Sequence, residues 1–330
     1  MTMAIINPAA QVMTVENFGA ELIARFVKFA GVSASSQETY AKALRRVFGY
    51  FAANSITVPT RENLIDWLAV MKSEGKSAST IQLYLTATKI FFRWTAQEGI
   101  FPNIADHLKA GVKPTHGHKK DALTAAQCGK LIQSVRCISA QKKKHNVEME
   151  LRNKAIIALM TTAGLRTIEV VRANVTDIRL ERGKMFLYVH GKGHACADEK
   201  VLLGKQVYAV IQAYLKNRAG LKPNAPLFVS TARSNRGARL DTQTIRKMVK
   251  ANLRGIGLDS PRLTAHSLRH SAATNLIYAG VDLPKVQMIL RHKNLATTMI
   301  YAAAWERYQN DGEQFLADAI FPVKGGIGNV

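Results

Sequence analysis

The stretch from Thr264 to Tyr301 constrains this chain more than any other. It places three histidines, two arginines and two tyrosines, the last of them Tyr301, within apolar segments of helical period. In its first part Leu268, Ala272 and Leu276 recur every four positions, which predicts a helix that buries this face and carries His266 and Arg269 on a neighbouring one. Burying such a polar pair costs free energy unless an anion or another partner meets it. The stretch is therefore a candidate anion-binding site.

A second helix is expected directly after the first. Gly280 ends the first helix, Asp282 is a candidate N-cap, and Pro284 falls in the first turn of the next helix, where its missing N–H is not needed. Together the helical segments are expected to bring His266, Arg269, His292 and Tyr301 within reach of one another.

The charge of the whole chain favours a polyanionic partner. The 330 residues carry a formal net charge of +23, and 47% of them are hydrophobic, which is enough for two cores. Nucleic acid is the simplest partner for such a basic protein. Membrane binding is disfavoured because no apolar run of about 18 residues is present. We find no secretion signal, and three scattered cysteines fit a reducing cytoplasm, so a cytoplasmic protein is expected.

The first part of the chain predicts a compact helical domain at 14–100, after a tail at 1–13. Helices are expected at 14–30, at 61–74 and at 77–98. A further helix, the second in order, is expected to begin after Ser35 as N-cap, with Glu38 completing a capping box. Basic side chains lie between the apolar stripes and are candidate contacts to a DNA backbone, with a solvated face as the equal alternative: Lys42, Arg45, Arg46, Lys76, Lys89 and Arg93.

A linker is predicted at 101–120, where the helical pattern lapses into prolines, glycines and basic residues. His116 and His118 lie in it, but two loop histidines without a third ligand do not predict a metal site. The second domain is expected over 121–330. The basic run at 141–145 is interpreted as an exposed loop, with DNA contact as the second possibility.

Two further basic positions stand out in the second domain. Arg166 follows a helix-breaking glycine, where its guanidinium can bind a phosphate and Glu169 can orient it, although a local ion pair is the plain alternative. Short strands are predicted at 185–189 and 199–203, which places Lys192 near the tip of a hairpin. His190 and His194 flank that turn, but their spacing does not converge on a metal in a hairpin.

These basic residues suit a phosphodiester whose charge grows in the transition state. Tyr301 adds a nucleophile, but a tyrosine of pKa about 10 costs about 4 kcal/mol to ionise at pH 7, which neighbouring cations or a histidine base must offset. The sequence shows no D-x-D group and no phosphate-binding glycine loop, which argues against two-metal nuclease chemistry and nucleotide use. No metal and no cofactor is expected.

The motifs together resemble the tyrosine recombinases of the phage-integrase and Xer-like family over nearly the whole chain. AGLRTIEV, HGKG, HSLR and LRHKNLATTMIY resemble the family's boxes in the expected order. The resemblance implies a mainly α fold with a small β-sheet, formed by a four-helix core-binding domain and a mixed α/β catalytic domain. It assigns the catalytic set as Tyr301 (nucleophile), Arg166, Lys192 (general acid), His266, Arg269 and His292, with Glu169 in support.

The resemblance also implies a reaction and an assembly. Tyr301 would form a 3′-phosphotyrosyl link, and a homotetramer on two double-stranded DNA sites would exchange strands through a Holliday junction, for integration or excision of a mobile element or for resolution of replicon dimers. The tail helix is expected to dock either on a neighbouring subunit or on its own domain. A cytoplasmic, nucleoid-associated protein of prokaryotic or phage origin is implied. The target site and accessory proteins do not follow from the sequence.

One departure from the family pattern concerns Arg291, where a glycine is usual. Either the turn before His292 is built differently, or Arg291 adds a contact to DNA phosphate. Two alternatives to a recombinase stay open at this point. One is a type IB topoisomerase-like relaxing enzyme, and the other is a non-catalytic DNA-binding module.

Overall fold

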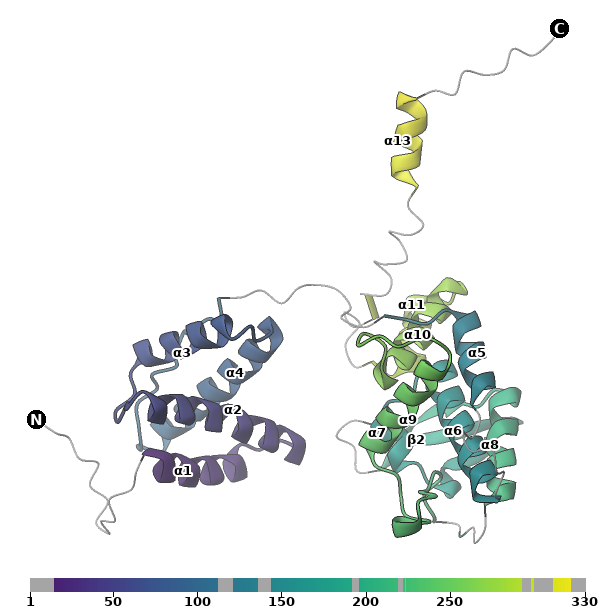
Figure 1. Cartoon of the computed structure of the whole chain (residues 1–330), viewed down its shortest axis with the longest axis horizontal. Coiled ribbons are helices and arrows are strands. Elements are labelled where there is room, and N and C mark those ends of the chain that lie inside the picture. Colours follow the sequence, from purple (N-terminus) through teal and green to yellow (C-terminus); the bar gives the residue numbers. More distant parts are fainter. Residues whose placement is uncertain are drawn as a thin grey trace, which may run out of the picture. The chain divides into compact units, whose positions relative to one another are not determined.

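The computed structural model describes residues 15–111, 121–135, 144–191, 196–218, 222, 224–292, 298–299 and 311–321. The chain divides into two compact units, Met1–His116 and Gly117–Val330 (Figure 1). Each unit has its own hydrophobic core. The fold is mainly helical with one small sheet, as the sequence predicts.

The described residues of the first unit form four helices: α1 (Val15–Phe29), α2 (Ala34–Ala53), α3 (Arg61–Ser73) and α4 (Ala78–Gln97). Their core is rich in aromatic residues, including the buried side chains of Phe26, Phe51, Trp67 and Phe91. The predicted capping box at Ser35 is wrong, because α2 begins at Ala34 after Ser33. Serine occurs three times in this segment, so sequence alone allows more than one start.

The segment after α4 packs onto this first core. Ala105, Leu108 and Ala110 are buried against it, although no helix or strand forms there. The prediction of a linker over 101–120 remains a prediction, because 112–120 lie outside the described residues. His116 and His118 fall among those residues.

The second unit combines helices with a three-stranded sheet. Its helices pack around α6, whose residues Ile156, Ile157 and Leu159 are fully buried. The elements are α5 (Ala125–Ser134), α6 (Lys144–Thr162), α7 (Thr167–Arg172), the 3-10 helix η1 (Val175–Asp177), β1 (Ile178–Glu181), β2 (Lys184–His190), β3 (Ala197–Leu202), α8 (Lys205–Asn217), the 3-10 helix η2 (Arg233–Asn235), α9 (Thr242–Gly255), α10 (Ala265–Tyr278), α11 (Leu283–Leu290) and α13 (Gly312–Ile320).

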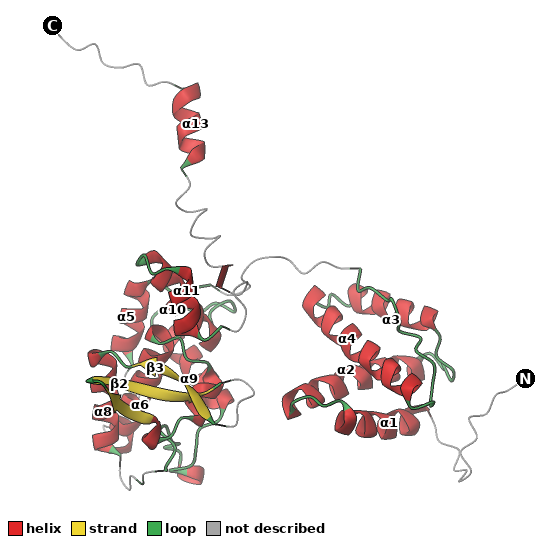
Figure 2. Ribbon diagram, turned by 180° about the vertical axis from the view of Figure 1, so that it is seen from behind, coloured by secondary structure: helices red, strands yellow, loops and turns green. Residues whose placement is uncertain are grey.

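The strands form one antiparallel sheet in the order β1, β2, β3 (Figure 2). Leu187, Val189 and Val201 point into the core, and the register shifts between Val189 and His190, next to the turn that carries Lys192 in the sequence. The predicted hairpin is therefore present. β1 was not predicted, because it is only four residues long and its Leu180 is 68% exposed.

The turn after α6 brings the chain close to α11. Gly164 has φ +59°, and a Cβ at this position would lie 2.4 Å from Leu290 Cδ2, so only glycine fits without rearrangement. α10 contacts α5, α6 and α9, and α11 packs against α10 through Val286 and Leu290. As the sequence predicts, α11 begins after Asp282 with Pro284 in its first turn.

Candidate active site

Arg269 is held between two loops by backbone carbonyls. Arg269 belongs to α10, and only 3% of the residue is exposed to solvent. Nη1 donates a hydrogen bond to the Gly164 carbonyl at 2.6 Å, and Nη2 donates to the Leu290 carbonyl. Because these carbonyls come from the turn after α6 and from the end of α11, the orientation of Arg269 depends on both elements.

Arg166 is the N-cap residue of α7 and is oriented by Glu169. Its backbone N–H donates to Glu169 Oε2 at 2.8 Å, and Nη1 donates to Glu169 Oε1. Its Nη2 donates to the Arg291 carbonyl at 3.0 Å, and the side chain remains 26% exposed. The guanidinium is thus fixed on one side and open to solvent on the other, as binding of an external anion requires.

Glu169 is a fully buried carboxylate among arginines. Burial alone would raise its pKa, but Arg291, then the Arg166 N–H, and the charges of Arg166 and Arg269 together lower its pKa below the ordinary value. It is therefore ionised at neutral pH, and its negative charge offsets part of the positive charge gathered here.

His292 follows α11 and joins the same cluster. Its N–H donates to the Gln287 carbonyl at 3.1 Å, Gln287 Nε2 donates back to the His292 carbonyl at 3.0 Å, and its Nδ1 lies 2.9 Å from Thr298 Oγ1. Burial first, and then the charges of Arg269 and Arg166, lower the pKa of this imidazole to about 4. The ring is neutral at pH 7 in the absence of an anion.

His266 lies in the first turn of α10 and is exposed. Its ring packs edge-on against His270, with centroids 4.5 Å apart. His266 also contributes to the lowered pKa of His292, so the two predicted histidines belong to one electrostatic cluster. His270 is buried and was not singled out from the sequence, although its position one turn after His266 could have identified it.

Arg291 adopts the left-handed conformation that favours glycine, with φ 56° and ψ 49°. The expectation that this turn is built differently is therefore wrong. Its side chain is only 4% exposed, and Nη2 donates to Glu169 Oε2 at 2.8 Å, while Nη1 donates to the Ile289 carbonyl at 2.6 Å. The predicted contact of Arg291 with DNA phosphate stays a prediction. The buried Glu169 carboxylate holds the guanidinium inside the protein.

Two predicted catalytic residues, Lys192 and Tyr301, lie outside the described residues. The structure does place the ends of β2 and β3 on either side of 192–195, and it describes Thr298 and Met299 as helical. The cluster that it brings together is therefore Arg166, Glu169, His266, Arg269, Arg291 and His292.

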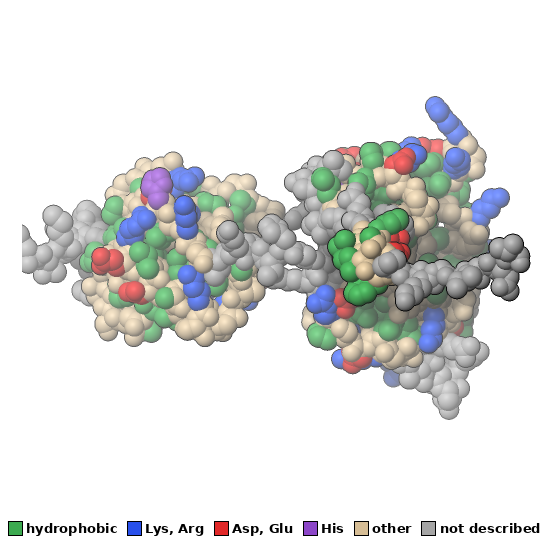
Figure 3. All heavy atoms as spheres, turned by 90° about the horizontal axis from the view of Figure 1, so that it is seen from above, with side chains coloured by type: hydrophobic (Ala, Val, Ile, Leu, Met, Phe, Trp, Pro, Cys, Tyr) green, Lys and Arg blue, Asp and Glu red, His purple; other side chains and the backbone are tan. Residues whose placement is uncertain are grey.

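The candidate DNA contacts of the first unit lie on its surface. Lys42 and Arg45 are exposed on α2, and Arg93 is exposed on α4, where Lys89 is half-buried. Arg46 and Lys76 both approach Glu74, at 2.5 and 3.6 Å. Basic side chains are visible on both units in Figure 3.

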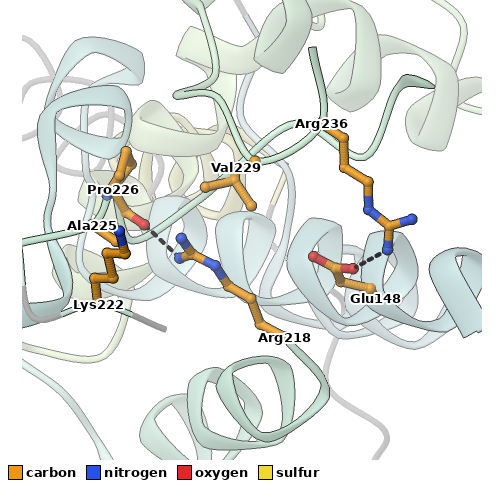
Figure 4. Close-up of a pocket in the computed structure, with 8 residues that line it drawn as sticks. Glu148, Arg218, Lys222, Ala225, Pro226, Val229 and Arg236 are labelled. Atoms are coloured by element: carbon orange, nitrogen blue, oxygen red, sulfur yellow. Dashed lines mark hydrogen bonds and ion pairs between the residues drawn. The ribbon is translucent and has the colours of Figure 1, made fainter. Parts of the chain in front are cut away.

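A separate hollow of about 290 Å³ lies elsewhere on the second unit (Figure 4). Arg218, Lys222 and Arg236 line it together with Glu148. Arg218 already donates to the Pro226 carbonyl, and Arg236 pairs with Glu148 at 3.5 Å. Two of these three cations are thus satisfied by the protein itself, and the hollow is lined by none of the clustered arginines.

The described residues contain no group of three metal-ligating side chains. His194, one of the two histidines that flank the hairpin turn, lies outside the described residues. Residues 141–143 of the basic run at 141–145 also lie outside them. Within the described part of the chain, no helix combines the length and the apolar character needed to cross a membrane.

Comparison with known proteins finds two matches to family models. The phage integrase family matches residues 123–307, and the phage integrase N-terminal SAM-like domain matches residues 23–99. Tyrosine recombinase XerA of Pyrococcus horikoshii is 31% identical over 241 residues, covering 72% of this chain and 73% of that protein. Tyrosine recombinase XerD of Listeria monocytogenes is 29% identical, covering 74% of this chain and 81% of that protein.

Solved structures with the same fold include two recombinases bound to DNA. XerH site-specific recombinase on its difH substrate, in a pre-cleavage complex, has a TM-score of 0.69 and 21% identity, covering 89% of this chain and 95% of that one. A lambda integrase dimer on a COC′ core site has a TM-score of 0.62 and 17% identity, covering 85% of this chain and 76% of that one.

Proposed function

This chain belongs to the phage integrase family, and we propose that it cleaves and rejoins DNA strands through a 3′-phosphotyrosine link formed by Tyr301. As a member of this family it is a tyrosine recombinase, an enzyme of site-specific DNA recombination. The observation that carries the proposal is the turn at 290–292, whose carbonyls accept from Arg269 and Arg166 and which ends on His292.

The proposed step is an attack of the Tyr301 hydroxyl oxygen on the phosphorus of one DNA phosphate. Arg166 and Arg269 bind the non-bridging oxygens, whose charge grows as the new bond forms. The bond from phosphorus to the 5′ oxygen breaks, and Lys192 donates a proton to that oxygen. His266 accepts the tyrosine proton, and His292 donates a hydrogen bond to the transition state.

A second DNA strand reverses the step. Its 5′ hydroxyl attacks the phosphotyrosine, restores the phosphodiester and frees Tyr301. The energy of the broken bond is kept in the phosphotyrosine, so the proposed reaction is balanced without a metal or a nucleotide. The neutral imidazole of His292 supports the proposal, because it can donate from one ring nitrogen while the other meets Thr298.

We further propose that four copies act on two double-stranded DNA sites and exchange strands through a Holliday junction. The structures of XerH and lambda integrase on DNA support a DNA partner. The helix α13 supports a contact between subunits, because Phe315 and Leu316 are 76% and 61% exposed. Action on cytoplasmic, nucleoid-associated DNA, in integration, excision or dimer resolution, is part of this proposal.

The test is covalent trapping on DNA nicked opposite to the scissile phosphate. The unaltered protein is expected to form a protein–DNA adduct that resists denaturant, and Tyr301→Phe is expected to form none while DNA binding stays within about twofold. The Tyr308→Phe variant is the matched control and should form the adduct normally. An adduct on Tyr301→Phe would refute the assignment of the nucleophile.

The products of the same reaction separate recombination from DNA relaxation. Two duplexes carrying the target site should yield recombinant strands, which a relaxing enzyme acting as a monomer does not make. Relaxation of supercoiled DNA without recombinants would favour the topoisomerase-like alternative. Binding without any adduct would favour a non-catalytic DNA-binding module.

A further inference from the structure

The Arg291 side chain lies between two carboxylates from different elements. Its Nη2 donates to Glu169 Oε2 at 2.8 Å, and its Nε lies 3.8 Å from Glu199 Oε2. Glu169 belongs to α7, which begins after Arg166, and Glu199 belongs to β3. Arg291 Nε and Glu199 Oε2 are buried, and neither has a hydrogen-bond partner among the described residues. The Arg291 guanidinium thus lies between a carboxylate of α7 and a carboxylate of β3.

The backbone of the same turn orients the two phosphate-binding arginines. The Arg291 carbonyl accepts from Arg166, and the Leu290 carbonyl accepts from Arg269. Both carbonyls depend on the left-handed conformation of Arg291, at φ 56°. That conformation is unfavourable for a residue with a Cβ, so other contacts must hold it. The buried ion pair with Glu169 is the strongest candidate, because charge-assisted hydrogen bonds are stronger than neutral ones.

The ion pair also sets the charge around Arg166. Glu169 accepts from both Arg166 and Arg291, so its negative charge is shared between two guanidinium groups. Without Arg291, Arg166 would be the main hydrogen-bonding cation for a buried carboxylate. The pull of Glu169 on Arg166 would then be greater, and less of that guanidinium would be available to an incoming phosphate.

We propose that Arg291 is a positioning residue that fixes Arg166 and Arg269 toward the scissile phosphate and links them, through Glu199, to strand β3. The proposal rests on the proposed function. In this proposal Arg291 acts through other residues and not by a direct contact with DNA, because its side chain is buried. In this chain the Arg291 side chain therefore stabilises a left-handed turn that glycine can adopt without any side-chain contact.

The variants Arg291→Gly and Arg291→Lys test this role. Glycine keeps the left-handed turn and loses the guanidinium, while lysine keeps the charge and loses the two-pronged geometry. We expect Arg291→Gly to slow single-turnover cleavage of a nicked DNA substrate by tenfold or more, with about 1.4 kcal/mol per factor of ten. Arg291→Lys should recover only part of this loss.

The matched control is Arg182→Gly. Arg182 also has a positive φ, of 47°, but it is exposed in the turn between β1 and β2. Its replacement should leave the cleavage rate within about twofold. Thermal unfolding of each variant gives the fraction of protein that is folded at the assay temperature, and the cleavage rates are normalised to this fraction.

A second substrate distinguishes positioning from a general loss of structure. In a methylphosphonate, a methyl group replaces one non-bridging oxygen of the scissile phosphate, so guanidinium groups have less charge to bind. If Arg291 acts by positioning Arg166 and Arg269, the defect of Arg291→Gly should shrink at least threefold on this substrate. An equal defect on both substrates would overturn the proposal.

The ion pair is tested independently of cleavage by acid unfolding. Because Arg291 lowers the pKa of Glu169, the stability from this carboxylate is present above its unfolded pKa and is lost as pH falls through its folded pKa. Arg291→Gly should begin to lose stability at a higher pH, and adding Glu169→Gln should remove this difference. An unshifted acid profile would overturn the pairing.

The outcomes separate the two proposals. An unaltered protein that forms no covalent adduct would refute the proposed function and the positioning role together. An unaltered protein that forms the adduct, with Arg291→Gly cleaving at the normal rate, would refute only the role of Arg291.

Discussion

The imidazole of His292 shows how one residue depends on its charged surroundings. Burial and then the charges of Arg269, Arg166, Arg291 and His266 disfavour its protonated form. A DNA phosphate bound by the arginines would offset their charge, because it brings a negative charge into the cluster. The protonation state of His292 should therefore respond to occupation of the site.

We predict that His292 titrates at about 4 in the free protein and at a higher pH with a non-cleavable DNA site bound. The folded pKa lies below the ordinary value of about 6.5, so the unfolded state takes up the proton first and stability falls as pH drops from about 6.5 to about 4. NMR titration of the ring, assigned with His292→Gln, measures both values. A free-protein titration near 6.5 would contradict the prediction, as would no change on DNA binding.

At the scale of elements, local sequence patterns predict most of the helices, whereas they do not predict contacts between segments that are distant in the sequence. Thr124 and Asp241 cap α5 and α9, and each cap bonds to a residue only three positions away, within the range of a local pattern. The partnership of Arg291 with Glu169 joins positions 122 apart in the chain, which no periodicity reveals. The lysine of the hairpin and the tyrosine were assigned by resemblance, and their positions stay predictions.

Helix α2 allows a test of the predicted contacts between the first unit and the DNA backbone. Lys42 and Arg45 lie one turn apart and are both exposed, so they share a face of the helix. We predict that Lys42→Ala with Arg45→Ala weakens DNA binding and lowers the slope of log affinity against log salt by about 2, since each lost phosphate contact contributes about 0.9. Fluorescence anisotropy at several salt concentrations measures both effects.

A matched pair on another helix supplies the control. Arg25 and Lys28 have the same charge and spacing on α1, and both are exposed. Their double replacement by alanine should leave the salt slope nearly unchanged. Equal changes for the two pairs would show that the effect comes from total charge, and that α2 does not contact DNA specifically.

At the scale of the whole molecule, α13 exposes several apolar side chains in a single copy. Leu316 and Ile320 lie one turn apart at 61% and 60% exposure, next to Phe321 at 75%. Burial of such side chains is worth about 1.5 to 3 kcal/mol each, so a surface that covers them would stabilise an assembly. This argument favours a second copy as the partner, in line with the proposed tetramer.

We therefore predict that Leu316→Asp with Ile320→Asp blocks strand exchange while cleavage of a nicked single site stays within about threefold. The charges would oppose burial of this face in a neighbour without altering the arginine cluster. Sedimentation of protein–DNA complexes measures assembly, and recombinant products measure exchange. Gln314→Asp, on a residue of α13 that bonds to Asp318, is the control and should assemble normally. Loss of single-site cleavage in the double variant would instead mean that α13 packs on its own subunit.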